Sequence, residues 1–161
     1  MKITVKQLVR GALIAALYAA LTIFLAPISF GSIQFRLSEV LTVLPFIMPE
    51  AVPGLTIGCL LANWLGGSTI FDIIFGTIAT FLAAFITSKT KNMWLAPLPA
   101  VVSNGVIVGF VVTLMTVDFT LSAYALIALS ISISEFIICY VGGIPFLVFM
   151  NGVASKYSFF K

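Results

Sequence analysis

Histidine is absent from this 161-residue sequence, and cysteine occurs only twice. Without histidine, the chain cannot be a hydrolase or an intramembrane protease built on a Ser-His pair, and it cannot bind a metal or haem through imidazole. Cys59 and Cys139 stand singly inside apolar runs, without the clustered spacing of a metal site or of a disulfide framework. We expect both cysteines to be buried packing residues, and we expect no metal site.

Charged residues are also scarce, at 8% of the chain, whereas hydrophobic residues make up 61% and the mean hydropathy is +1.24. This composition is far too apolar for a domain with an ordinary water-exposed surface. It predicts an all-α integral membrane protein in which residues 1–161 form a single membrane domain. The net charge of +3 does not indicate nucleic-acid binding, because the basic residues lie at span ends, where they would face lipid headgroups.

Two nucleotide-binding motifs are missing as well. The sequence has no Gly-rich Lys-Ser/Thr loop for ATP and no dinucleotide fingerprint. We therefore expect no enzyme and no cofactor bound by this chain, and any transport against a gradient must be powered by a partner or by an ion. The inverted repeat of many secondary transporters is not evident either.

Proline, glycine and charged residues divide the chain into six apolar stretches. We expect six transmembrane helices, over residues 8–26, 37–49, 52–66, 69–87, 94–116 and 121–150. A crossing helix needs about 20 residues, so the second and third stretches are short and are tilted, extended into the headgroup region or a broken pair. Six crossings put both termini on one side. Seven of the eight basic residues share that side, which predicts a multi-pass cell-membrane protein with both ends inside (N-in/C-in) and only Arg36 outside.

Small residues recur every four positions on two of these helices. Ala12, Ala16 and Ala20 form such a stripe on the first helix, and a second stripe occupies the third helix, at Gly54, Gly58, Ala62 and Gly66. Stripes of small residues let helix backbones approach closely in lipid. Each stripe serves either internal packing or the docking of another membrane protein.

Ionisable and amide side chains inside a membrane are costly, and they are candidate functional groups. Glu135 lies near the middle of the sixth stretch, Asn104 lies mid-span in the fifth, and Asp72 begins the fourth. We expect them to line an acidic pocket that is open to the outside, with Asp72 near its mouth and Asn63 on the same external side. Such carboxylates and amides can bind the donor and acceptor edge of a heterocycle or a cationic amine. Two plainer interpretations stay open, in which Asp72 caps its helix and Glu135 is paired internally.

Arg36 and Glu39 are opposite charges three residues apart at the start of the second helix. They can form a salt bridge on the external loop, where the preceding segment "PISFGSIQF" has the composition of a lid over a pocket. Alternatively, either residue contacts a ligand directly. A surface pair without a role is the third possibility, since such pairs contribute little.

Several segments in order resemble one known family. "ALIAALYAALTIFLAPISFGSIQFRLSEVLTVLPF", "PGLTIGCLLANWLGG", "DIIFGTIATFLAAFIT" and "WLAPLPAVVSNGVIVG" are similar to the QueT family, over about residues 8–150. Proteins of this family are substrate-binding S components of energy-coupling factor (ECF) transporters, which take up queuosine precursors. The resemblance implies a six-helix S-component bundle in a bacterial plasma membrane. It also implies partners, namely a transmembrane coupling (T) subunit and two ATPase subunits that use the ATP.

The resemblance further implies a docking surface and a cargo. Ala12, Ala16 and Ala20 match the alanine stripe by which S components contact the coupling subunit. The implied cargo is a 7-deazaguanine such as preQ1, or queuine. As our hypothesis, Glu135 and the Asn104 amide bind its guanine-like edge, and Asp72 or Glu39 binds its cationic aminomethyl group. The alternatives are an S component for another small vitamin, and an autonomous proton-coupled carrier that uses Glu135.

Overall fold

Helices make up all the regular structure in the computed structural model, which describes residues 4–30, 35–116 and 119–156. The described residues contain no strand. The chain forms helical segments in six regions, which match the six predicted apolar stretches. Their bounds are α1 Val5–Phe24 with the short α2 Ala26–Ser29; η1 Leu37–Phe46; α3 Ala51–Leu65; η2 Asp72–Gly76 with α4 Thr77–Thr87; η3 Met93–Leu95, α5 Leu98–Ser103, η4 Asn104–Val108 and α6 Gly109–Thr116; and α7 Leu121–Phe136, η5 Ile137–Gly143 and α8 Ile144–Lys156.

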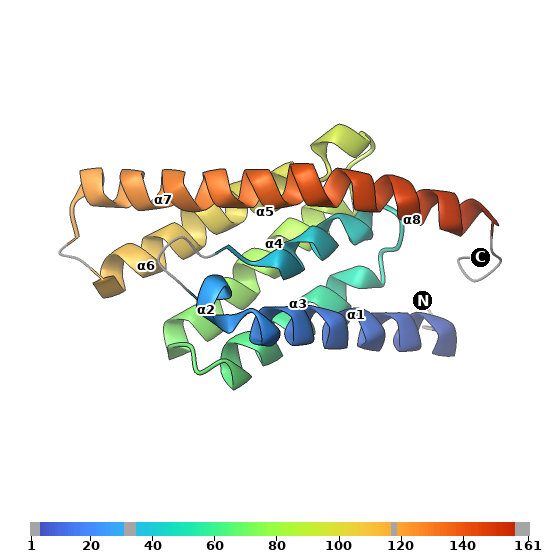
Figure 1. Ribbon diagram of the computed structural model, residues 1–161, viewed down its shortest axis with the longest axis horizontal. Helices are drawn as coiled ribbons and strands as arrows, with labels where there is room; N and C mark the ends of the chain where they lie inside the picture. Colours follow the sequence, from blue (N-terminus) through green and yellow to red (C-terminus); the bar gives the residue numbers. More distant parts are fainter. Residues whose placement is uncertain (1–3, 31–34, 117–118, 157–161) are drawn as a thin grey trace.

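Three of the six regions are long and apolar enough to cross a membrane. These are Val5–Phe24, Met93–Met115 and Leu121–Ala154, whereas Leu37–Phe46, Ala51–Leu65 and Asp72–Thr87 are shorter apolar helices. Successive regions run in alternate directions along the long axis, and the first turn of α1 lies at the same end of the bundle as the last turn of α8 (Figure 1). The all-helical membrane class is therefore supported, and the crossing of all six regions stays a prediction.

The glycines of α3 pack against α1 and settle the role of that stripe. A Cβ atom added at Gly54 would lie 2.6 Å from the Gly11 carbonyl oxygen, and one added at Gly58 would lie 2.9 Å from the Ala15 carbonyl oxygen and from the Tyr18 Cβ. No side chain fits at such distances from backbone atoms. The α3 stripe thus serves internal packing, and it lets the two helices come together.

The alanine stripe of α1 lies on the side of the helix that points away from α3 and the rest of the bundle. Ala12, Ala16 and Ala20 are exposed, while Ala15 and Ala19 beside them are buried against the bundle. The face that carries the stripe is apolar throughout, because its large side chains are exposed too, at Leu8, Val9, Leu13 and Leu17. This face is therefore exposed in the described chain, and its use in docking stays a prediction.

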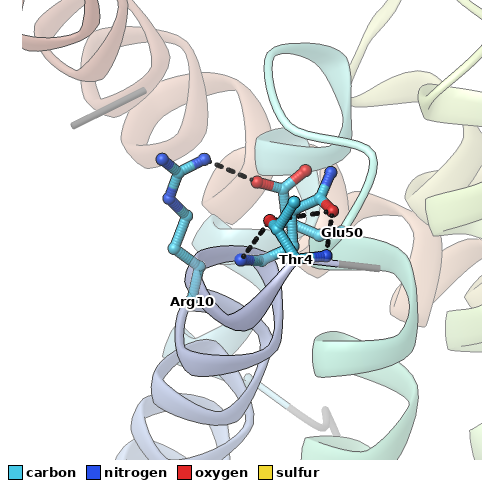
Figure 2. A network of polar contacts seen from close by, with 4 residues as sticks. Thr4, Arg10 and Glu50 are labelled. Atoms are coloured by element: carbon cyan, nitrogen blue, oxygen red, sulfur yellow. Dashed lines mark hydrogen bonds and ion pairs between the residues drawn. The ribbon is translucent and has the colours of Figure 1, made fainter. Parts of the chain in front are cut away.

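An ion pair closes the end of the bundle at which α1 begins. Arg10 Nη1 lies 2.8 Å from Glu50 Oε1, and both side chains are mostly buried, with 9% and 13% of their surface exposed. Figure 2 shows this contact beside the first turn of α1, where Thr4 caps the helix by accepting a hydrogen bond from the Gln7 N–H. The pair joins α1 to the residue that precedes α3.

Candidate functional site

The site is built on η1, whose geometry gathers polar residues on one face. This ten-residue helix is a 3₁₀ helix, with three residues per turn, so side chains three positions apart lie one above another. Glu39 and Thr42 follow this spacing, and Arg36, three positions before Glu39, is the N-cap residue of the helix; all three are buried, with exposed fractions of 1%, 0% and 5%. An α-helix would have turned each of them about 60° away from the next. The surface-pair interpretation of Arg36 and Glu39 is therefore wrong, since both side chains lie inside the protein.

Glu39 is held from α1. The Tyr18 hydroxyl donates a hydrogen bond to Glu39 Oε1, and Tyr18 itself is fully buried. The backbone carbonyl of Glu39 accepts a hydrogen bond from Thr42 Oγ1 at 2.6 Å. The second carboxylate oxygen, Oε2, is buried and has no hydrogen-bond partner among the described residues. One oxygen of Glu39 is thus fixed, and the other is left as an acceptor.

Glu135 approaches Glu39 from α7. Its side chain is 2% exposed, and the thiol of Cys139, one turn later, lies 3.6 Å from Glu135 Oε2. The same sulfur lies 3.6 Å from the Glu39 carbonyl oxygen and 3.8 Å from Thr42 Oγ1. Cys139 therefore joins α7 and η5 to η1, because it contacts the carboxylate of Glu135 and the backbone carbonyl of Glu39.

Asn104 and Arg36 complete this group. The Asn104 side chain is 5% exposed and lies near the carboxyl groups of both Glu39 and Glu135, without donating a hydrogen bond to Glu39 Oε2. Arg36 interacts electrostatically with the same two carboxylates. We call these four residues, Arg36, Glu39, Asn104 and Glu135, the buried cluster. Two carboxylates, an amide and a guanidinium can together bind N–H donors and a carbonyl of one small polar molecule.

The salt bridge predicted between Arg36 and Glu39 is not among the ion pairs of the described residues. Arg36 Nε instead donates to the Ser29 carbonyl oxygen at 3.4 Å, and its guanidinium lies over the Phe30 ring, 5.4 Å from the ring centroid. The Glu39 carboxylate instead accepts a hydrogen bond from the Tyr18 hydroxyl. The two residues therefore do not fix the predicted lid segment by an ion pair. Residues 31–34 of that segment lie outside the described part of the chain.

Asp72 and Asn63 lie apart from the buried cluster. Asp72 is half-buried, and Thr69 Oγ1 accepts a hydrogen bond from its N–H at 3.2 Å and donates one to its Oδ2 at 2.8 Å. Thr69 thus caps the start of this helix, and the Asp72 carboxylate accepts the hydrogen bond of the capping hydroxyl. Asn63 is fully buried, and its Nδ2 donates to the Asp72 carbonyl oxygen at 3.3 Å, while its Oδ1 has no partner in the described residues.

A hollow of about 220 Å³ lies between Arg36 of the buried cluster and Asp72. We call it the Arg36 hollow; it is lined by Phe30, Arg36, Gly66, Gly67, Ser68, Thr69 and Asp72. It is smaller than the roughly 300 Å³ at which pockets for small molecules usually begin. Of the buried cluster, Arg36 alone lines this hollow, and Asp72 lies on the same lining. The predicted acidic pocket with Asp72 near its mouth stays a prediction.

Three predicted site residues coincide with a change of helix type. Asp72 begins the π-helical segment η2, Asn104 begins η4, and Glu135 lies two residues before η5. Such wide turns are rare and occur frequently at functional sites. The described residues contain no group of three or more His, Cys, Asp or Glu side chains that could hold a metal ion.

Comparison with known proteins gives one family. The model of the QueT transporter family matches residues 8–152. The protein named queuosine precursor transporter QueT of Lactococcus lactis subsp. cremoris (strain MG1363) is 39% identical over 78 residues, which are 47% of this chain and 46% of that protein. The match thus spans about half the length of this curated relative. No solved structure matches.

Proposed function

Because this chain belongs to the QueT transporter family, and so is a membrane transport protein and not an enzyme, we propose that it is the substrate-capture subunit of an ATP-driven ECF importer. Its cargo in this proposal is a queuosine precursor, a 7-deazaguanine such as preQ1, or queuine, taken from outside the bacterial plasma membrane. The name of the Lactococcus relative supports this class of cargo. The observation that carries the proposal is the buried cluster, because it places two carboxylates and an amide together inside the bundle.

The hydrogen-bonding groups of the cluster match a guanine-like edge. Such an edge offers neighbouring N–H donors and a carbonyl acceptor. Glu135 accepts from the donors, and the Asn104 amide donates to the carbonyl. A ligand with a cationic aminomethyl group places it at Glu39 or at Asp72. The apolar side chains of the surrounding helices exclude water from these contacts, which strengthens them.

The outer face of α1 supplies the second part of the proposal. Ala12, Ala16 and Ala20 present a surface of small side chains that no described residue covers. In our proposal the transmembrane coupling subunit packs against it, and two ATPase subunits on that subunit supply the energy. This chain then needs no bound cofactor, in keeping with the absence of an ATP-binding loop from its sequence.

Equilibrium binding to the purified chain in detergent, without partners or ATP, tests the proposal. The ligands to compare are preQ1, queuine, guanine and thiamine. We expect selective binding of the deazapurines. Binding of thiamine alone would instead support an S component for another vitamin. Uptake by this chain alone in vesicles, driven by a pH gradient, would support the proton-coupled carrier with Glu135 as its proton site.

A further inference from the structure

The two carboxylate oxygens of Glu39 have different surroundings. Oε1 accepts the hydrogen bond of the Tyr18 hydroxyl, whereas Oε2 is buried without a partner among the described residues. A buried carboxylate oxygen without a donor is costly, and such an atom in a native fold calls for an explanation. Because the backbone around Glu39 is fixed by Thr42, the free acceptor has a defined position.

The charges of the buried cluster do not balance. Glu39 and Glu135 carry two carboxylates, and Arg36 supplies a single guanidinium. With both carboxylates ionised, one negative charge is left without a counter-charge inside the apolar bundle. An unbalanced charge in such surroundings is costly, so a ligand that brings one positive charge gains affinity by removing this imbalance.

Arg36 belongs both to the lining of the Arg36 hollow and to the buried cluster. It lines the hollow and interacts electrostatically with the carboxylates of Glu39 and Glu135. Its Nε donates a long hydrogen bond of 3.4 Å to the Ser29 carbonyl oxygen, and its guanidinium lies over the Phe30 ring. Both of these contacts are weak.

Tyr18 is packed closely against α3. It is fully buried on α1, and Gly58 of α3 leaves room for it, because a Cβ atom at Gly58 would lie 2.9 Å from the Tyr18 Cβ. The ring is packed, so its hydroxyl is fixed in space. Tyr18 therefore holds the Glu39 carboxylate in one orientation.

We propose that Glu39 Oε2 accepts the ammonium group of a monocationic ligand, and that Tyr18 is the positioning residue that fixes this carboxylate through Oε1. The inference rests on the proposed function and chooses Glu39 over Asp72 as the partner of the amine. Asp72 is only half-buried, so its carboxylate charge is better solvated than that of Glu39. Its Oδ2 also already accepts a hydrogen bond from the Thr69 hydroxyl. The ligand class is thus a heterocycle that bears one amine cation.

Isothermal titration of the purified chain with two ligands tests this. The first is 7-aminomethyl-7-deazaguanine, which is cationic, and the second is its uncharged 7-cyano analogue. We expect the wild type to bind the cation more than about tenfold more tightly, as one charge-assisted hydrogen bond provides. Glu39→Gln should bring this preference to within about twofold of unity. Tyr18→Phe should lower it severalfold, and the control Tyr124→Phe, whose hydroxyl contacts only the Val106 carbonyl in the described residues, should not change it.

The possible outcomes separate the two proposals. If the wild type binds neither deazapurine, the proposed function is overturned and this inference with it. If the wild type binds both equally, or if Glu39→Gln keeps the preference for the cation, the inference alone is overturned. A preference that Tyr18→Phe leaves unchanged removes Tyr18 as the positioning residue. Should Tyr18→Phe fail to fold, the Glu39→Gln result still decides the assignment of the amine.

Discussion

Ala16 and Tyr18 stand two positions apart on α1 and face opposite ways. Tyr18 is fully buried and hydrogen-bonded to Glu39, 21 positions later in the chain, whereas Ala16 is exposed on the outer face. Two positions on an α-helix are about 200° apart, so one helix presents both surfaces. A single rigid element thus connects the proposed docking surface to the proposed ligand site.

Ala16→Leu tests the docking surface. A leucine there adds bulk to an exposed face, so we expect ligand affinity of the isolated chain to be unchanged, and transport by the assembled complex to fall to background because close helix contact is lost. Ligand titration and uptake into vesicles measure the two effects. Ala125→Leu, at an exposed alanine of α7, is the matched control. Assembly and transport that survive Ala16→Leu would show that α1 is not the contact.

Glu135→Gln tests the ligand site. One acceptor of a charge-assisted pair becomes a donor that faces a donor, so we expect deazaguanine affinity to fall more than about tenfold. The same substitution at Glu50, far from the cluster, should leave affinity within about twofold of the wild type. Titration of both variants in detergent gives the comparison. An unchanged affinity of Glu135→Gln would remove this residue from the site.

The membrane class and the six helical segments could be predicted from hydropathy and from proline and glycine punctuation. Helix type could not. A 3₁₀ helix at Leu37–Phe46 and π segments that begin at Asp72, Asn104 and Ile137 differ from an α-helix only in hydrogen-bond register, and an apolar sequence carries no signal for that choice. Without the 3₁₀ geometry, the alignment of Arg36, Glu39 and Thr42 was not foreseeable.

Part of the candidate site followed from the cost of burying polar groups in a membrane. That principle singled out Glu135, Asn104 and Asp72, and the first two lie in the buried cluster, whereas Arg36 and Glu39 were singled out by their opposite charges three positions apart. It did not place Arg36 and Glu39 inside the bundle, because a short polar segment beside a span is equally compatible with a surface loop.

Tyr18, Thr42 and Cys139 were missed as members of the site. Their type alone suggests packing in a membrane helix. A signal existed for Tyr18, since a buried tyrosine hydroxyl usually has a hydrogen-bond partner, and Glu39 is that partner. For Cys139 the signal was its spacing, one helical turn after Glu135.

Gly54→Ala tests the contact between α1 and α3. Alanine is the better helix former by about 1 kcal/mol, but its Cβ would lie 2.6 Å from the Gly11 carbonyl oxygen, which is backbone and cannot move away alone. Overpacking of this kind costs about 1–3 kcal/mol, so we expect a net loss of stability. Thermal unfolding in detergent measures it. Gly152→Ala, where an added Cβ meets nothing within 4 Å, is the control and should not lower the midpoint. Equal midpoints for the two variants would mean that the helices can separate without cost.

Glu50→Gln tests the ion pair that joins α1 to the start of α3. The Arg10 and Glu50 side chains are mostly buried, so removal of the carboxylate charge takes the ion pair with Glu50 away from a guanidinium that has little exposure to water. We expect a loss of about 1–3 kcal/mol, between the values for exposed and for fully buried pairs, seen as a lower unfolding midpoint. Lys89→Gln, at an exposed lysine over the Phe85 ring, should change the midpoint much less. The loss should also persist at high salt, because a buried pair is poorly screened, and a midpoint that salt restores would instead identify a weak surface contact.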